Sequence, residues 1–396
     1  MGPVVLPGQT LGVLGGGQLG RMLAIAARRM GYRVICLDPT PDCPAGQVAD
    51  VELVAPYTDL DAARRLAEAS AAVTVEFENI PAATLEFVAG LRPTRPSARV
   101  LHIAQHRLRE KCWLQDNGFA TVQFAALSSH DIGSVRAAGE AVGFPAILKS
   151  ASFGYDGKGQ CSVGTLEQLQ TLAAELAMLG EGQPTGATHV LERRAELVCE
   201  LSVIVARSAD GRMVCYPVFE NTHVGGILDC TRCPADIEPT LAAAAVAVAE
   251  AIAEQIGMVG VLCVELFVDT GGRLLVNELA PRPHNSGHLT VDAAICCQFE
   301  QQLRCTAGLS LGPGDLAWPA AAMVQLLGDL WSAGEPDWGA ALACGPVKLH
   351  LYGKSGAREG RKMGHITAWG ATVGEAEALA RRARAAAAGG RSAERG

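Results

Sequence analysis

Apolar runs and helical stretches alternate along the first hundred residues. An apolar run over 10–14 is followed by a glycine turn over 15–20 and by an alanine-rich stretch over 21–30, which predicts a helix. A second apolar run over 32–37 ends at Asp38. A strand, a helix and a strand in this order form a parallel βαβ unit that binds ligands at the carboxyl ends of its strands. The chain is therefore predicted to begin with an α/β domain.

The pattern beyond this unit mixes strands and helices in an α+β order. A helix over 60–70, a strand over 72–77 and a helix over 102–117 extend the first domain. The middle of the chain is predicted to contain strands over 122–126, 146–149, 189–192, 200–206 and 213–220, helices over 132–142, 166–179 and 239–256, and a hairpin over 260–278.

The last eighty residues are predicted to be rich in short strands. These strands cover 320–327, 347–351 and 365–369, and one short helix follows them. The segment 380–396 consists mostly of alanine, arginine and glycine. We expect it to be a frayed helix end and a disordered tail.

Composition and charge exclude several classes of protein. The chain has 396 residues, 49% of them hydrophobic and 19% charged, so a globular protein of two or three domains is expected. A net charge of −8 argues against a nonspecific nucleic-acid binder. The longest apolar stretch, 241–249, is much shorter than the roughly 20 residues that cross a bilayer. The N-terminus has no features of a secretion signal, so a cytoplasmic protein is expected.

Thirteen cysteines are scattered along the chain, an odd number without a disulfide-type spacing. Cys230 and Cys233 form a C-x-x-C pair, which suits a redox pair or half of a zinc site. No second pair with metal-ligand spacing accompanies it, so ordinary reduced thiols are predicted.

The first glycine turn matches a dinucleotide fingerprint, Gly15-x-Gly17-x-x-Gly20, with Asp38 at the end of the next strand. Backbone N–H groups at the start of a helix bind phosphate because they lack partners. The turn is predicted to hold a dinucleotide or a phosphorylated small substrate. A tight turn without a ligand is the alternative.

A second glycine-rich segment, 154–160, follows Lys149 at the end of an apolar strand and carries its own lysine. Lysines and glycines in this order suit a nucleoside triphosphate, because the lysines neutralise phosphate charge and the glycines let backbone amides approach. The Walker A pattern does not occur. The alternative is a solvated surface turn.

Two glutamates occupy the predicted hairpin. Glu265 lies in an apolar strand and Glu278 follows Asn277 on the returning strand. Carboxylates in apolar strands are costly unless they are paired or bind metal, and opposite strands bring them face to face. Magnesium is predicted, and a pair with a buried arginine such as Arg282 is the alternative.

Two polar segments lie beyond the hairpin. Residues 282–288 follow the hairpin directly, so they lie beside the predicted metal site, and they are polar, turn-forming and dense in hydrogen-bond donors. A basic cluster near the C-terminus suggests an anionic small ligand, with a solvated loop as the alternative. Its members are Lys348, Lys354, Arg361 and Lys362.

Taken together, these motifs resemble the ATP-grasp superfamily, and within it the N5-carboxyaminoimidazole ribonucleotide synthase family. The resemblance runs from residue 11 to about residue 369 and rests on the motifs at 15–22, 75–79, 154–160, 277–288 and 360–365. It implies a Rossmann-like preATP-grasp domain over 1–112, an ATP-grasp domain with a mobile lid over 113–315, and a small β-rich domain over 316–396. Phe153 and Leu289 depart from the family pattern.

The resemblance also implies the ATP site and the reacting groups. Catalytic roles fall to Lys149, Arg282, Tyr155 and Asp156, and the two glutamates Glu265 and Glu278 are the expected ligands of two magnesium ions. The residues expected to contact ATP are Arg107, Lys149, Gly154, Tyr155, Asp156, Gly157, Lys158, Gly159, Gln160, Glu192, Arg193, Arg194, Ala195, Glu200, His223, Asn277 and Glu278.

A ribonucleotide site is implied in the same way. Its expected contacts are Gln18, Leu19, Glu76 and Asn285, and the phosphate is expected to meet Lys354, Arg361 and Lys362. The activity implied is ATP-dependent carboxylation of aminoimidazole ribonucleotide with bicarbonate through carboxyphosphate, in a homodimer that binds neither nucleic acid nor membrane. Three rivals are a formate-dependent glycinamide ribonucleotide transformylase, an NAD-dependent dehydrogenase and a noncatalytic nucleotide sensor.

Overall fold

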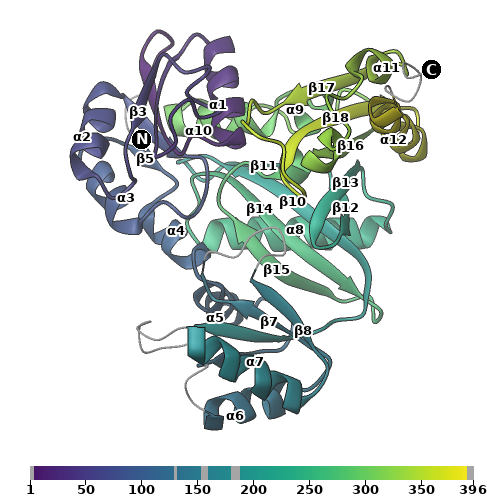
Figure 1. The fold of residues 1–396 in the computed structure, drawn as a ribbon. Helices are drawn as coiled ribbons and strands as arrows, with labels where there is room; N and C mark the ends of the chain where they lie inside the picture. Colours follow the sequence, from purple (N-terminus) through teal and green to yellow (C-terminus); the bar gives the residue numbers. More distant parts are fainter. Residues whose placement is uncertain (1–3, 129–131, 153–158, 180–187, 390–396) are drawn as a thin grey trace.

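The computed structural model describes residues 4–128, 132–152, 159–179 and 188–389, which form three β-sheets flanked by helices (Figure 1). The N-terminal part is α/β and the remainder is α+β, which confirms the predicted fold class. In Figure 1 the N-terminal part lies at the upper left, beside the C-terminal end of the central sheet at the upper right, and a small third sheet lies at the bottom.

The N-terminal sheet is parallel, with the strand order β3-β2-β1-β4-β5 of a doubly wound fold. The prediction of a parallel βαβ unit is confirmed. Apolar side chains on both sheet faces form two clusters of the core, beneath α1 and beneath α2. The elements are β1 (Thr10–Leu14), α1 (Gln18–Arg29), β2 (Arg33–Asp38), β3 (Val51–Val54), α2 (Leu60–Ala69), β4 (Ala72–Val75), α3 (Ala82–Ala89) and β5 (Thr94–Arg95).

The single helix predicted over 102–117 is wrong, because the chain forms two helices there. These are α4 (Ala98–Ala104) and α5 (Arg107–Asp116). His106 lies between them in an extended conformation and its Nδ1 accepts a hydrogen bond from the Arg109 N–H at 3.4 Å, as an N-cap of α5. The break places Arg107 at the start of α5, beside the hairpin glutamates.

The small sheet is antiparallel in the order β6-β9-β7-β8, and two helices cover it. Leu148, Leu191 and Leu169 are among the side chains that fill the space between sheet and helices. The elements are β6 (Phe124–Leu127), α6 (Ile132–Val142), β7 (Ala146–Ser150), β8 (Gln160–Val163), α7 (Leu166–Leu179) and β9 (His189–Arg193).

The central sheet follows the order β15-β14-β10-β12-β13-β16-β18-β17, with β11 paired to β10. Its first strands are β10 (Leu197–Arg207), β11 (Met213–Cys215), β12 (Phe219–Val224), β13 (Ile227–Cys233), β14 (Gly260–Asp269) and β15 (Leu274–Ala280). Its last strands are β16 (Ala320–Leu327), β17 (Val347–Leu351) and β18 (Lys362–Gly370). The C-terminal strands therefore continue the central sheet through the β13–β16 pair.

The helices around this sheet lie on both of its faces. The alanine-rich α8 packs against β10 and β14 on one side. No described helix is long and apolar enough to cross a bilayer. The helices are α8 (Pro239–Gln255), η1 (Asn285–Gly287), α9 (Thr290–Ala293), α10 (Gln298–Ala307), η2 (Gly328–Trp331), α11 (Trp338–Leu342) and α12 (Val373–Gly389).

Two predictions about strands and helices fail in this region. The strand predicted over 213–220 is split into β11 and β12, and β13 was not predicted at all. The segment 380–389, predicted to be a frayed end, belongs to α12, whose Ala383 and Ala387 are buried against the sheet. All thirteen cysteines are free, and Cys230 and Cys233 are buried within β13.

Candidate active site

The glycine turn between β1 and α1 holds two carboxylates. Both carboxylate oxygens of Glu76 accept hydrogen bonds from the turn, from the Gly17 N–H at 2.8 Å and from the Gly20 N–H at 2.7 Å. The Gly16 N–H donates to Asp38 Oδ2 at 2.8 Å. A dinucleotide pyrophosphate would need these same donors, so the structure disfavours a dinucleotide at this turn, and the phosphorylated small substrate stays a prediction. A Cβ at position 17 would lie 2.4 Å from Glu76 Oε1, so a larger residue there would displace the carboxylate.

Two predicted substrate contacts border this turn, Glu76 after β4 and Leu19 in α1, and both side chains are restricted. Burial raises the pKa of Glu76, although its two hydrogen bonds from N–H groups lower it in part. Leu19 is 6% exposed and packs in the core of the N-terminal part. Leu19 can therefore meet a ligand only through its backbone.

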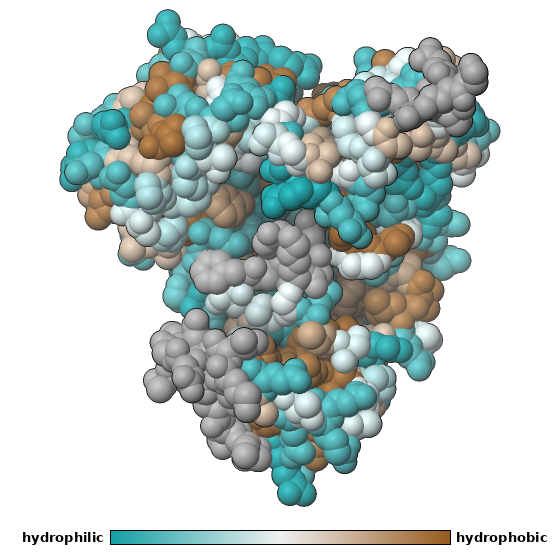
Figure 2. Space-filling view, in the orientation of Figure 1, coloured by the Kyte–Doolittle hydropathy of each residue, from teal (hydrophilic) through white to brown (hydrophobic). Residues whose placement is uncertain are grey.

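Four predicted ribonucleotide contacts come together where the three parts of the chain meet. Gln18 Nε2 donates to Asn285 Oδ1 at 2.7 Å, and Lys354 Nζ donates to Gln18 Oε1 at 2.5 Å. Lys354 Nζ also donates to the carbonyl of Lys362 at 2.8 Å. Gln18, Asn285, Lys354 and Lys362 are called the junction cluster below. Figure 2 shows a hydrophilic surface where the N-terminal and C-terminal parts meet.

Arg361 lies next to the junction cluster in the sequence, but its hydrogen bonds go to its own loop. Its Nη1 donates to the carbonyl of Ser355 and, at 2.8 Å, to the carbonyl of Gly356. The guanidinium therefore holds the loop that carries Lys354. Its contact with a substrate phosphate stays a prediction.

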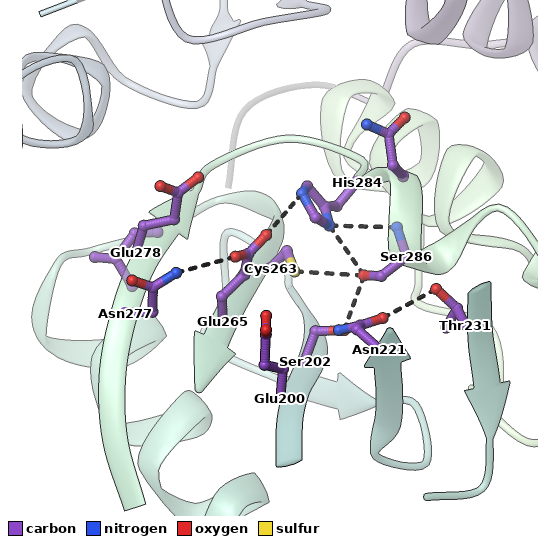
Figure 3. A network of polar contacts seen from close by, with 12 residues as sticks. Glu200, Ser202, Asn221, Thr231, Cys263, Glu265, Asn277, Glu278, His284 and Ser286 are labelled. Atoms are coloured by element: carbon purple, nitrogen blue, oxygen red, sulfur yellow. Dashed lines mark hydrogen bonds and ion pairs between the residues drawn. The ribbon is translucent and has the colours of Figure 1, made fainter. Parts of the chain in front are cut away.

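The hairpin glutamates face each other as predicted. Glu265 on β14 and Glu278 on β15 are register partners. Asn277 Nδ2 donates to Glu265 Oε2 at 3.3 Å, and Glu265 Oε1 lies 3.0 Å from His284 Nε2 (Figure 3). Asn277 Oδ1 is buried and has no hydrogen-bond partner among the described residues. Two carboxylates and an unpartnered amide oxygen are the ligand types that magnesium prefers, so these residues fit the ion.

Charge at this site is balanced by His284. Burial alone would raise the pKa of Glu265, but the hydrogen bond and charge of His284 outweigh burial and hold that pKa well below its ordinary value. Burial would lower the pKa of His284, but contacts with Cys263 and Glu265 raise it. The two side chains therefore form a charged pair at neutral pH.

Arginine pairs with the hairpin as well, although not through the arginine that the sequence suggested. Arg282 binds Glu78 through Nε and, at 3.1 Å, through Nη2. Glu278 Oε2 instead accepts a hydrogen bond from Arg107 Nη1 at 3.0 Å. Burial and the charge of Glu278 raise the pKa of nearby Glu110 well above its ordinary value. Glu78, Arg107, Glu110 and Glu278 line a cavity of about 40 Å³.

Lys149 lies at the end of β7 with a carboxylate partner. Its Nζ donates to Glu192 Oε2 at 2.7 Å, and Lys111 Nζ lies 3.3 Å from Glu192 Oε1. Burial would raise the pKa of Glu192, but the two lysines lower it below its ordinary value. Lys111 is 1% exposed and was missed from the sequence, because nothing in a helical segment marks one lysine as buried.

Most of the predicted lid lies outside the described residues, namely Gly154, Tyr155, Asp156, Gly157 and Lys158. The next two residues are described. The carbonyl of Gly159 accepts a hydrogen bond from the Ser150 N–H at 2.8 Å, and Gln160 starts β8 opposite Lys149. The glycine segment is therefore anchored to the strand that carries Lys149.

The predicted adenine hinge follows Glu192 at the end of β9. The Arg193 N–H donates to the carbonyl of Gln123 at 2.8 Å, and the Arg194 N–H donates to the carbonyl of Pro145 at 3.0 Å. Both N–H groups are used within the chain, whereas Ala195 is half-buried just beyond them. An adenine contact at this hinge stays a prediction.

The predicted ribose ligand Glu200 and the predicted nucleotide contact His223 form a pair. Glu200 Oε2 lies 2.8 Å from His223 Nδ1. Burial would lower the pKa of His223, but Glu200 outweighs burial and raises it. These side chains come from β10 and β12, which are neighbours in the central sheet.

A chain of hydroxyl and amide groups supports His284 from below (Figure 3). His284 Nδ1 lies 2.9 Å from Ser286 Oγ, and Ser202 Oγ donates to Ser286 Oγ at 2.8 Å. Asn221 Nδ2 donates to Ser202 Oγ at 3.0 Å. The polar run over 282–288 pointed to part of this network. Ser202 and Asn221 carried no signal, because small polar residues are common in strands.

Three sequence models of protein families match the chain in succession. The ribonucleotide synthetase preATP-grasp domain matches residues 8–105, and the ATP-grasp domain matches residues 112–299. The phosphoribosylaminoimidazole carboxylase C-terminal domain matches residues 321–379.

Whole-chain comparisons agree with these matches. The chain is 41% identical over 364 residues to the N5-carboxyaminoimidazole ribonucleotide synthase of Bacillus subtilis, covering 92% of each chain. It is 41% identical over 362 residues to that of Brucella melitensis, covering 91% of this chain and 96% of the other.

Solved structures of related synthases superpose on this chain. The Thermus thermophilus synthetase of the same name has a TM-score of 0.84 and 38% identity, covering 94% of this chain and 97% of the other. An Aspergillus clavatus synthase in complex with ADP and 5-aminoimidazole ribonucleotide has a TM-score of 0.85 and 28% identity, covering 96% and 98%. The chain therefore belongs to the N5-carboxyaminoimidazole ribonucleotide synthase family of the ATP-grasp superfamily.

Proposed function

We propose that this chain carboxylates 5-aminoimidazole ribonucleotide with bicarbonate, converting ATP to ADP and phosphate, in purine biosynthesis. One observation carries the proposal. The segment from Asn277 to Asn285 runs directly from the paired glutamates to the junction cluster, so the proposed phosphoryl-transfer site would adjoin the proposed ribonucleotide site. The Aspergillus clavatus relative, which holds ADP together with this ribonucleotide, supports it.

The proposed reaction has two steps. A bicarbonate oxygen attacks the γ-phosphorus of ATP, the bond to the β-phosphate oxygen breaks, and carboxyphosphate and ADP form. The exocyclic amine of the ribonucleotide then attacks the carboxyl carbon of carboxyphosphate. In the alternative route it attacks carbon dioxide released from carboxyphosphate. Phosphate leaves, the amine loses a proton, and the N–C bond of the product remains.

The chain's own side chains supply charge for the first step. We propose that Lys149 and Arg107 bind the ATP phosphates and that Arg282 holds the bicarbonate side of the site, because cations placed where negative charge develops accelerate phosphoryl transfer. We also propose catalytic roles for Tyr155 and Asp156, as the resemblance to the family implies. Both lie outside the described residues.

We propose magnesium at the hairpin, with two ions expected. Glu265 and Glu278 would hold it, with Asn277 Oδ1 beside them, and when bound it would neutralise charge on the transferring phosphoryl group. His284 would keep the Glu265 carboxylate ionised before the ion arrives, and Glu278 is paired with Arg107.

We propose further that the protein is a cytoplasmic homodimer whose partners are small molecules. The net charge of −8 supports the absence of nucleic-acid binding. Sedimentation of the purified chain tests the dimer.

ADP release assays with each ribonucleotide, with and without bicarbonate, test the activity. ADP release should depend on aminoimidazole ribonucleotide and bicarbonate together. Equal stimulation by formate and glycinamide ribonucleotide would move the assignment to the transformylase. Tight NADH binding without ATP binding would overturn it, although the carboxylates in the glycine turn already disfavour a dehydrogenase.

A further inference from the structure

A second group of metal-ligating side chains lies apart from the hairpin glutamates. Asp292 on α9, His350 on β17 and His365 on β18 each offer one ligand atom, and the three atoms lie within 4.8 Å of one another. His350 and His365 are register partners on adjacent strands, and their rings stack with centroids 4.6 Å apart. Asp292 Oδ2 lies 2.7 Å from His350 Nε2.

The hydrogen bonds around His365 leave one ring nitrogen without a partner. Tyr352 Oη lies 3.0 Å from His365 Nδ1 and donates to Gln325 Oε1 at 3.4 Å. In the tautomer in which this hydroxyl accepts from a protonated Nδ1, the lone pair of the ring is on Nε2. His365 is fully buried, and its Nε2 has no hydrogen-bond partner among the described residues. A buried acceptor without a partner is costly, and a metal ion would satisfy it.

We propose that Asp292, His350 and His365 bind one divalent transition metal of the zinc class. One carboxylate and two imidazoles are ligands of Zn²⁺ and its neighbours, whereas Mg²⁺ prefers oxygen ligands alone. A histidine that binds a metal through one ring nitrogen commonly donates a hydrogen bond from the other, and Tyr352 Oη is the partner of His365 Nδ1 here. The site differs from the proposed magnesium site in its residues and in its chemistry.

The size of the group fits such an ion after a small contraction. Ligands about 2.0–2.2 Å from a tetrahedral zinc lie about 3.3–3.6 Å from one another. The present spread of up to 4.8 Å exceeds this, and the 2.7 Å contact between Asp292 and His350 must open. His350 has a side-chain exposure of 29%, so an ion can enter from solvent and a water can fill the fourth position.

Binding would join α9 to the end of the central sheet. Asp292 follows closely on the 285–287 turn that holds Asn285, while β17 leads into the loop that holds Lys354. The ion would therefore tie together two segments of the junction cluster without touching its members.

Cobalt(II) titration of the full chain tests the site, after chelator treatment and with excess magnesium to occupy the hairpin. The wild-type chain should bind a single Co²⁺ with visible d–d bands of nitrogen and oxygen ligands, and Zn²⁺ should displace it. Zn²⁺ should also raise the melting temperature. Asp292→Asn and His350→Gln should each weaken Co²⁺ binding by at least about tenfold and abolish the Zn²⁺-dependent rise. Both variants retain a hydrogen-bonding side chain, and both positions are only partly buried, so the variants should fold.

His102→Gln on α4 is the matched control, because this histidine is exposed and lies outside the group. It should bind Co²⁺ as the wild-type chain does. Three outcomes would each overturn the proposal: no Co²⁺ binding, equal binding by the ligand variants, or the intense near-ultraviolet bands of a cobalt thiolate, which would assign the ion to cysteines.

Discussion

The Glu278 side chain pairs with an arginine and is partly exposed, so a substitution can remove its charge. Its carboxylate is 37% exposed and binds Arg107 at 3.0 Å. Replacement by glutamine keeps the shape and removes the charge. We expect Glu278→Gln to abolish turnover at saturating magnesium, with a smaller loss of ATP affinity, because metal charge matters most where phosphoryl charge develops. ADP release and ATP titration of the same preparation measure the two effects.

Glu254→Gln is the matched control, since this glutamate is exposed on α8, away from the site. It should leave both quantities unchanged. A wild-type rate in Glu278→Gln at saturating magnesium would end the proposed role as metal ligand.

A substitution at Arg361 tests whether the basic C-terminal cluster binds a substrate phosphate or only stabilises its own loop. A charge-assisted hydrogen bond is worth about 1.5–3 kcal/mol, which corresponds to about a ten- to hundredfold change in binding. Arg361→Ala should raise the KM for the ribonucleotide by this factor and leave the KM for ATP nearly unchanged, because ATP is expected at Lys149. Steady-state kinetics with each substrate varied in turn measures the split.

Arg136→Ala provides the control, because Arg136 on α6 is an exposed arginine in a surface pair with Glu140. Its two KM values should equal those of the wild-type chain. If Arg361→Ala weakens both substrates alike, the hydrogen bonds to Ser355 and Gly356 explain the residue as loop support, and the phosphate role is wrong.

At the scale of elements, α12 is held to the central sheet by ion pairs as well as by alanines. Asp229 on β13 accepts hydrogen bonds from Arg381 Nη1 at 2.9 Å and from Arg384 Nη1 at 2.5 Å. Burial would raise the pKa of Asp229, but the two arginines outweigh it and lower the pKa below its ordinary value. The ionised form therefore stabilises the fold, and α12 depends on it.

Asp229→Asn should lower the free energy of unfolding by about 1–3 kcal/mol at pH 7. A carboxylate with a lowered pKa stabilises the fold above its unfolded pKa and loses that effect as the pH falls through its folded pKa. The difference from the wild-type chain should therefore shrink as the pH falls below about 4. Urea unfolding at several pH values measures it, and Asp116→Asn at the exposed end of α5 serves as the control.

A difference between Asp229→Asn and the wild-type chain that stayed constant down to pH 3 would contradict this account. It would mean that the substitution acts through packing rather than through charge.

Elements with a strong pattern of their own were predictable from the sequence. Strand β1, helix α8 and the β14–β15 hairpin each contain enough apolar periodicity to be located, and the hairpin placed Glu265 opposite Glu278. Strand β13 was missed because its alternation is interrupted by Asp229 and Arg232, whose partners lie on α12 and β12. The break between α4 and α5 was missed because one histidine cap decides it.

At the scale of the whole molecule, the hydrophobic periodicity of the sequence could not have predicted that the residues of the junction cluster lie together. Gln18 is separated by 267 positions from Asn285 and by 336 positions from Lys354. Only the resemblance to a family suggested that these residues share a ligand. Glu76 shows the reverse case, because no pattern in the sequence indicated that its carboxylate fills the glycine turn.

The junction cluster predicts that ribonucleotide binding and whole-molecule stability are linked through Gln18. A ligand held by the N-terminal, central and C-terminal parts stabilises all three together, by about 2.7 kcal/mol at 100 times its Kd. Gln18→Ala removes the bridge between Asn285 and Lys354. If the Kd for the ribonucleotide then rises about tenfold, the stabilisation at the same ligand concentration should fall by about 1.4 kcal/mol.

Thermal and urea unfolding with the ribonucleotide or with ATP measures this linkage. In Gln18→Ala the stabilisation by ATP should be unchanged, because ATP is expected between β7 and the hairpin rather than at the junction. Gln255→Ala, at the exposed end of α8, should behave as the wild-type chain with both ligands. A loss of stabilisation by both ligands in Gln18→Ala would mean that the junction holds the parts in place for any ligand. An unchanged response to the ribonucleotide would place that ligand away from Gln18, since a side chain that bridges two contacts of a ligand cannot be removed without affecting its binding.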